Sequence, residues 1–194
     1  NFTATPSTVI TRFASLDNTQ ETAGVVSAAK GAGVMAVDTA TGRIAGFLVH
    51  NVTNTTQAHV HLGARGVPGN VLVPLAPVGA GNPNLYAVPD NTFFPDPAAD
   101  VASFLAGNLY FNVHSSNPNG AAGEIRGQID MTPTSIRFAS LDNTQETTGS
   151  TSTGKSGGIF AVDEATGRIA GFLVHDVADA TRALALLHRG GFAG

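Results

Sequence analysis

The feature that most constrains this chain is an internal repeat with an offset of 125 residues. Residues 12–22 recur without a mismatch as residues 137–147, and residues 40–50 recur in the same way as residues 165–175. Between residues 12 and 52, roughly 30 of 41 aligned positions are identical, which indicates a tandem duplication of one structural unit. Both copies are therefore expected to form the same strands.

The second copy is shorter than the first in the sequence given. Nothing in it corresponds to residues 70–130, and leucines stand where the first copy has His59 and His61. We therefore predict three parts: a complete domain at 10–131, a junction at 132–136 and an incomplete repeat of the first half of the domain at 137–194.

Turn residues between short apolar segments predict an all-β fold. The chain has 23 glycines and 10 prolines, whereas only 12% of its residues are charged. Segments typical of strands, separated by turn signals such as that at 117–120, lie at 43–52, 71–75, 109–114 and 124–130. Residues 101–106 predict one helical turn with Asp100 as its N-cap. The pattern favours an antiparallel, Greek-key-like sandwich or barrel with a partial second β-domain.

Four separated blocks resemble the CHRD domain, a family first described in chordin and found in many exported bacterial proteins. They occur in the expected order, at residues 58–63, 66–75, 105–114 and 123–129. The resemblance implies an extracellular, all-β, non-enzymatic module. The phrase His59-Val60-His61, followed by a glycine-rich loop, also resembles the copper strand of copper/zinc superoxide dismutase.

The two faces of the expected strands separate apolar side chains from histidines. Residues two apart in a strand lie on one face, about 6.6 Å apart along the chain, so His59 and His61 can approach one ion. His114 shares its face with polar side chains. The apolar residues Ala58, Val60, Leu62, Leu109, Phe111 and Val113 would face the core. The three histidines are therefore expected on an outer surface of the sheet.

Imidazole nitrogens without cysteine suit copper(II), with zinc as the alternative. We predict His59, His61 and His114 as ligands, with His50 as a fourth at the end of its strand. The competing interpretation is that these are ordinary surface histidines hydrogen-bonded to loops. At most His175 and His188 remain in the second copy, so one complete site per chain is expected.

Composition argues against several functional classes. Cysteine is absent, which excludes disulfide scaffolds and thiolate chemistry. The net charge of −4 does not indicate the basic surface that a nucleic-acid-binding protein needs. No apolar run approaches the roughly 20 residues that a membrane span needs. A Thr/Ser-rich start without methionine predicts a secreted protein, extracellular, at the cell surface or in the periplasm. Glu124 and Arg126 share a strand face and predict cross-strand ion pairs.

Two functions from different classes follow. The first is a secreted, non-enzymatic module that binds copper or zinc. The alternative is a structural protein that forms oligomers or fibres, in which residues 137–194 are completed by strands from a neighbouring subunit. No catalytic residue is predicted, and superoxide-dismutase-like copper chemistry is the least favoured option.

Overall fold

The computed structural model describes residues 7–78, 84–146, 149 and 151–177. Strands dominate it, and the prediction of an all-β fold is confirmed. In the first domain the elements, in chain order, are β1 (Val9–Asp17), η1 (Asn18–Gln20), β2 (Lys30–Asp38), β3 (Ile44–His50), β4 (Thr55–Leu62), β5 (Val71–Pro74), β6 (Ala76–Pro77), β7 (Leu85–Ala87), α1 (Pro97–Leu105), β8 (Leu109–Ser115), η2 (Gly120–Ala122) and β9 (Ile125–Gln128).

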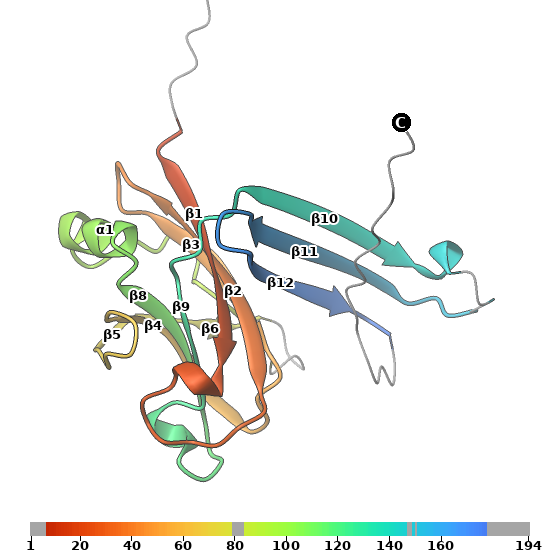
Figure 1. The fold of residues 1–194 in the computed structure, drawn as a ribbon, viewed down its shortest axis with the longest axis horizontal. Coiled ribbons are helices and arrows are strands. Elements are labelled where there is room, and N and C mark those ends of the chain that lie inside the picture. Colours follow the sequence, from red (N-terminus) through yellow and green to blue (C-terminus); the bar gives the residue numbers. More distant parts are fainter. Residues whose placement is uncertain (1–6, 79–83, 147–148, 150, 178–194) are drawn as a thin grey trace, which may run out of the picture. The chain divides into compact units, whose positions relative to one another are not determined.

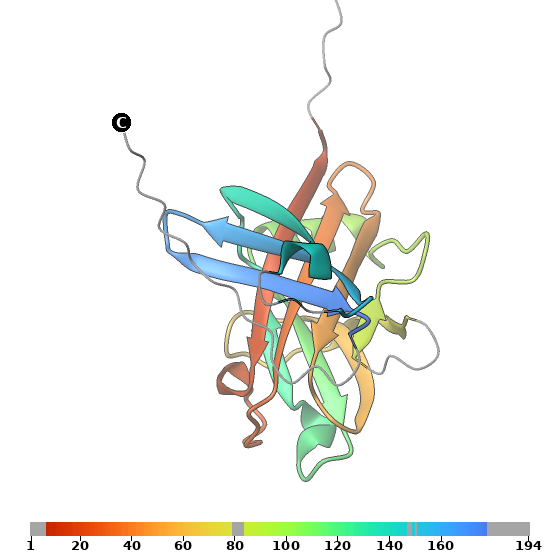
Figure 2. The ribbon, with the colours of Figure 1, turned by 90° about the vertical axis from the view of Figure 1, so that its right-hand side faces the viewer.

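These strands form one antiparallel sheet in the order β5-β4-β8-β9-β1-β2-β3-β7-β6. In Figure 1, β4, β5 and β8 lie on one side of the domain and β1, β2 and β3 on the other; the turned view of Figure 2 shows β1–β3 side by side. The helix α1 lies at one end of the sheet (Figure 1). The sheet curls back on itself because its two terminal strands belong to one short segment.

That segment runs from residue 71 to residue 77. Its first part, β5, pairs with β4, and its second part, β6, pairs with β7 at the opposite end of the strand order. Leu75 lies between them, and its amide donates to the carbonyl oxygen of Ala58 at 3.0 Å. The sheet is thereby nearly closed into a barrel. Pro74 is the last residue of the terminal strand β5, where proline is tolerated because it has no amide hydrogen to donate to a neighbouring strand.

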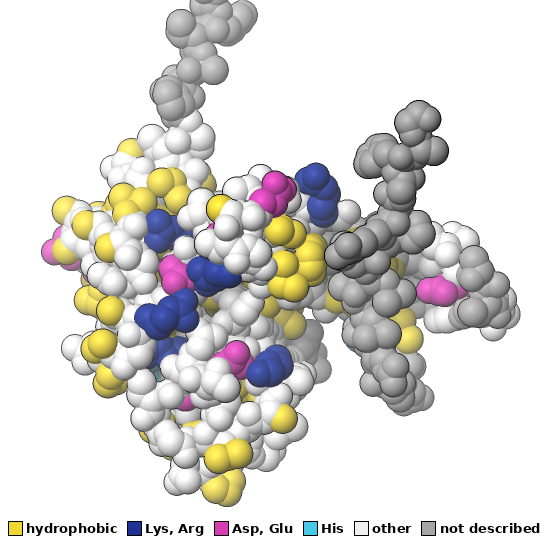
Figure 3. All heavy atoms as spheres, viewed as in Figure 1, with side chains coloured by type: hydrophobic (Ala, Val, Ile, Leu, Met, Phe, Trp, Pro, Cys, Tyr) yellow, Lys and Arg dark blue, Asp and Glu magenta, His cyan; other side chains and the backbone are white. Residues whose placement is uncertain are grey.

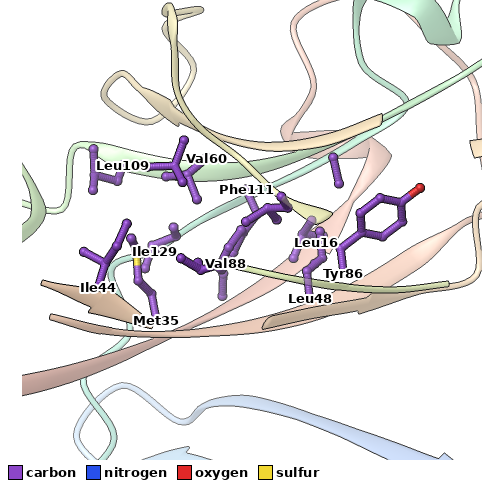
Figure 4. Packing of buried hydrophobic residues seen from close by; sticks show 14 of the residues in the cluster. Leu16, Met35, Ile44, Leu48, Val60, Tyr86, Val88, Leu109, Phe111 and Ile129 are labelled. Atoms are coloured by element: carbon purple, nitrogen blue, oxygen red, sulfur yellow. The ribbon is translucent and has the colours of Figure 1, made fainter. Parts of the chain in front are cut away.

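Apolar side chains from both sides of the barrel meet in one core (Figure 4). Val60 and Phe111 come from β4 and β8, and they face Met35 and Leu48 from β2 and β3; each is fully buried. Gly33 makes room for this packing, because a Cβ there would lie 2.6 Å from the ring of Phe111. The inward face predicted for residues 109, 111 and 113 is confirmed, since all three are 0% exposed.

The helix begins earlier than the sequence predicted. It starts at Pro97 instead of residue 101, and Asp96, not Asp100, is its N-cap. The Asp96 carboxylate accepts from the amide of Ala99 at 3.2 Å, while the Asp100 carboxylate accepts from the amide of Asp96 at 3.0 Å. Proline at the first helical position has no amide hydrogen to leave unpaired, which places the start there.

A separate three-stranded sheet follows in the sequence. It contains β10 (Ser135–Asp142), β11 (Lys155–Asp163) and β12 (Arg168–His175), with η3 (Asn143–Gln145) after β10. These elements lie where the offset of 125 residues places the equivalents of β1, β2, β3 and η1. The domain boundaries at 10–131, 132–136 and 137–194 stay a prediction, and residues 178–194 lie outside the described part of the chain.

No helix among the described residues is long and apolar enough to cross a membrane. The face drawn in Figure 3 carries acidic and basic side chains intermixed, with apolar side chains scattered between them.

Candidate metal centre

Three of the four predicted ligands come together on the outer face of the paired strands β4 and β8. In the register of this pair, His59 lies opposite Asn112, and His61 lies opposite Tyr110, so His114 is diagonal to His59. The ring centroids of His59 and His114 are 4.9 Å apart, those of His59 and His61 5.5 Å, and those of His61 and His114 5.8 Å. One nitrogen from each ring lies within 4.8 Å of the others.

Backbone carbonyls fix the proton on two of these rings. The Nδ1 of His61 lies 2.9 Å from the carbonyl oxygen of Gly69, and the Nδ1 of His114 lies 3.1 Å from that of Ala121. A carbonyl only accepts, so each Nδ1 carries the hydrogen and each neutral ring has its lone pair on Nε2. Both Nε2 atoms are buried and have no hydrogen-bond partner among the described residues. This is the arrangement that metal-binding histidines commonly show.

His59 contributes the third unpaired nitrogen. Its Nδ1 is buried and has no partner in the described part of the chain. Leaving a buried polar atom unpaired is costly, and native proteins rarely do so without a ligand, water or ion nearby. Within the described residues, this is the only group of three or more His, Cys, Asp or Glu side chains placed closely enough to share an ion.

Burial keeps the three imidazoles in the neutral form that binds metals. Desolvation, with smaller contributions from His114 and His61, lowers the pKa of His59 to about 4. Desolvation also lowers the pKa of His61 and of His114, against the opposing effect of their carbonyl partners. At neutral pH no proton has to leave these rings before an ion binds.

The histidines lie on the predicted face, but that face is more covered than expected. His61 is only 8% exposed, because the loop at residues 63–70 folds over it. The inward position predicted for Leu62 is wrong, since this side chain is 39% exposed. Leu62 ends β4, and the pairing of β4 with β5 shifts register between Val60 and His61.

Side chains from β8 and β9 hold this loop in place. Arg126 donates to the carbonyl oxygens of Ala64 at 2.7 Å and Val67 at 3.0 Å. Gln128 donates to that of Gly63 at 2.8 Å, and the Tyr110 hydroxyl accepts from the amide of Gly69 at 3.0 Å. Sequence reasoning did not find these residues. The alternation of polar and apolar residues in 124–130 pointed to their face but not to the loop above it.

Glu124 and Arg126 do not form the predicted cross-strand ion pairs. Both are buried, and Glu124 accepts from the side chains of Ser27 at 2.7 Å, Asn117 at 2.8 Å and Ser115. Burial raises the pKa of Glu124, but these hydrogen bonds lower it by more than burial raises it. The net pKa of Glu124 therefore lies below the usual value. Its carboxylate therefore ties three segments together instead of pairing with a cation.

His50 is not brought into the group of three. It ends β3, where it is 4% exposed and stacks on Tyr86 with centroids 5.6 Å apart. Its Nδ1 accepts from the amide of Val52 at 3.2 Å, so the hydrogen of the neutral ring is on Nε2. His175 ends β12, and His188 lies outside the described residues.

Comparison with known proteins gives one family. The model of the CHRD domain matches residues 12–129, which is more than half of the chain and includes every residue of the histidine group. Neither the curated proteins nor the solved structures gave a match. The match agrees with the four blocks of resemblance in the sequence. The chain therefore belongs to the CHRD domain family, a family of extracellular β-modules.

Proposed function

We propose that this protein is a secreted, non-enzymatic CHRD module that holds one transition-metal ion through His59, His61 and His114. Two observations carry the proposal: one nitrogen from each of the three rings lies within 4.8 Å of the others, and each ring has a buried nitrogen without a hydrogen-bond partner among the described residues. Imidazole ligands at about 2.0–2.1 Å from a shared ion would satisfy all three. His50 is left out of the ligand set because the lone pair on its Nδ1 already accepts a hydrogen bond from the amide of Val52.

Copper(II) is favoured over zinc. The donor set is all nitrogen, and for such sites the usual order of affinity places Cu²⁺ above Zn²⁺. Cysteine is absent from the sequence, so the cysteine ligand of a blue-copper centre is absent too. Three protein ligands fall short of the four of a closed structural zinc site, so a further coordination position would be left to solvent.

Metal analysis tests this function. The full chain, dialysed against excess Cu²⁺ and passed through gel filtration, is expected to retain about one copper per chain. The variant with His59→Ala and His61→Ala is expected to retain none, whereas His175→Ala, which changes a histidine on β12, is expected to behave as wild type. Equal copper retention by the double variant and wild type would refute the site.

A second candidate function is self-assembly through residues 137–194, with a second copy of the chain as the partner. The observation in its favour is a contrast between equivalent apolar residues. Leu16 and Ile44 are 1% and 3% exposed in the barrel core, whereas Leu141 and Ile169, their counterparts in the three-stranded sheet, are 38% and 55% exposed. Apolar surface in water costs about 25 cal/mol per Å², which favours covering these side chains.

The size of the native chain tests assembly. The full chain is expected to sediment as an oligomer or polymer, and the variant with Leu141→Ser and Ile169→Ser as a monomer. Val26→Ser is the matched control, because Val26 is 97% exposed in a loop of the first domain. A compact wild-type monomer at high concentration would refute assembly and leave the metal-binding proposal unaffected.

A further inference from the structure

Arg126 is a buried cation, and the histidine group does not by itself explain why its charge is buried. It is 2% exposed and forms no ion pair with any described carboxylate. A buried charge is costly unless its surroundings compensate for it. The compensation comes from the carbonyl oxygens of Ala64 and Val67, the side-chain oxygen of Gln128 at 3.2 Å and the ring of Tyr110. The carboxylate of Glu21 adds an electrostatic attraction without forming an ion pair.

The hydrogen bonds of Arg126 act on the loop that holds His61. Ala64 and Val67 lie in the loop at residues 63–70. The same loop contains Gly69, whose carbonyl oxygen accepts from the Nδ1 of His61. The guanidinium therefore fixes the backbone that presents this acceptor. As long as the acceptor stays in place, the hydrogen of His61 stays on Nδ1 and the lone pair on Nε2 remains free for an ion.

The ring contacts of Arg126 act on the plane of the same imidazole. Its Cζ lies 3.4 Å from the centroid of the Tyr110 ring, and that ring stacks on His61 with centroids 5.0 Å apart and planes inclined by 16°. The Tyr110 hydroxyl also accepts from the amide of Gly69. Arg126, Tyr110 and His61 thus form one stack, and the loop is bonded to each of them.

We propose that Arg126 is a positioning residue that sets the tautomer and ring orientation of His61 through the loop at 63–70 and through Tyr110. The inference rests on the proposed function, in which His61 is a ligand. Arg126 itself touches no ion. Its guanidinium offers a planar fork that lysine lacks, so it can hold two carbonyls and stack on a ring at once.

The structure contains a matched control. Arg12 on β1 also donates to two backbone carbonyls, those of Phe104 at 2.5 Å and Leu105 at 2.9 Å, and its Cζ lies 5.1 Å from the Phe104 ring centroid. Its contacts hold the end of α1 instead of the loop over His61. Arg12→Lys therefore removes the same kind of interaction at a place that does not support the histidine group.

The experiment compares Arg126→Lys with Arg12→Lys in the full chain. Nitrogen NMR of the metal-free protein reports which His61 nitrogen carries hydrogen, and competition titration reports Cu²⁺ affinity. Arg126→Lys is expected to give a mixture of His61 tautomers and an affinity lower by about 10- to 100-fold. Arg12→Lys is expected to retain the wild-type tautomer and affinity. Tyr110→Phe keeps the stack but loses the contact with Gly69, so its effect on both readouts should be smaller than that of Arg126→Lys.

Two outcomes would overturn this role. One is an Arg126→Lys variant that matches Arg12→Lys in both tautomer and affinity. The other, if Arg126→Lys does not fold, is a folded Arg126→Gln variant, which also lacks the guanidinium fork, with wild-type His61 tautomer and affinity. A wild-type chain that binds no Cu²⁺ would refute the proposed function instead, and the tautomer comparison in metal-free protein would still decide the role of Arg126.

Discussion

His59 on β4 and His114 on β8 lie diagonally across one strand pair, with ring centroids 4.9 Å apart and ring planes inclined by 60°. Diagonal neighbours in an antiparallel pair share a face, and rings of this size reach one another there. A slip of one residue in the pairing would send His114 to the core face. The histidine group is therefore a consequence of strand register, which the core residues Val60 and Phe111 enforce from the other side.

The loop over His61 is expected to depend on Gly69 more than on its neighbour Gly66. A Cβ on Gly69 would overlap the carbonyl of Leu62, so Gly69→Ala must displace the loop and the carbonyl that accepts from His61. Gly66 has a φ of +75° but open space, so Gly66→Ala should cost only about 1 kcal/mol. Urea unfolding and Cu²⁺ titration should show a larger stability loss and weaker binding for Gly69→Ala alone. Equal Cu²⁺ affinity in the two variants would contradict this account of the loop.

Stability is expected to fall as the pH drops from about neutral to mildly acidic. Burial lowers the pKa of His50 from 6.5 to about 4, although Glu124 acts in the opposite direction. Between these values the unfolded chain binds more protons than the folded chain, so the folded state loses stability as the pH falls through this window. Urea unfolding of the metal-free protein at pH 7 and pH 5 measures the loss.

His50→Gln is the variant that tests this explanation. Glutamine does not titrate, so the drop in unfolding free energy between pH 7 and pH 5 should be smaller than in wild type. The remaining drop would come from His59, whose pKa burial lowers to about 4, and from His61 and His114, whose pKa burial also lowers. If both proteins lose the same stability between the two pH values, His50 does not titrate as described.

The sequence predicted those features that follow from alternation along a strand. The core positions Leu109, Phe111 and Val113, and the shared face of His59 and His61, follow from a period of two. The turn predicted at 117–120 follows from its turn residues, and there the amide of Gly120 donates to the carbonyl oxygen of Asn117 at 2.8 Å. Each of these depends on neighbouring residues only.

Features that depend on distant segments could not be predicted in the same way. Arg126 is buried because a loop some sixty residues earlier supplies its acceptors, and no local pattern places that loop. For the same reason the outer face was expected to be open, and Glu124 was expected to pair with a cation. The closing of the barrel at Leu75 is a further case, since it depends on β5 and β6 pairing with β4 and β7, which are far apart in the strand order.

The buried carboxylate of Glu124 is expected to matter for stability and not for metal binding. Glu124→Gln replaces one carboxylate oxygen, which accepts, by an NH2 group, which donates. That group would face the donors on Ser27, Ser115 and Asn117, so the free energy of unfolding should fall by about 1.5–3 kcal/mol. The exposed Glu146 gives the control, and Glu146→Gln should be nearly neutral. Urea unfolding measures the difference. A loss of Cu²⁺ binding in folded Glu124→Gln would show that the network also supports the histidines.

The central claim is that three histidines on β4 and β8 form one metal site, and Cu²⁺ titration of the metal-free full chain tests it most directly. Wild type is expected to bind one equivalent, and each of His59→Ala, His61→Ala and His114→Ala to bind it much more weakly. His50→Ala and His175→Ala, whose histidines lie on other strands, should retain wild-type affinity. One equivalent bound with unchanged affinity in all three ligand variants would contradict the site.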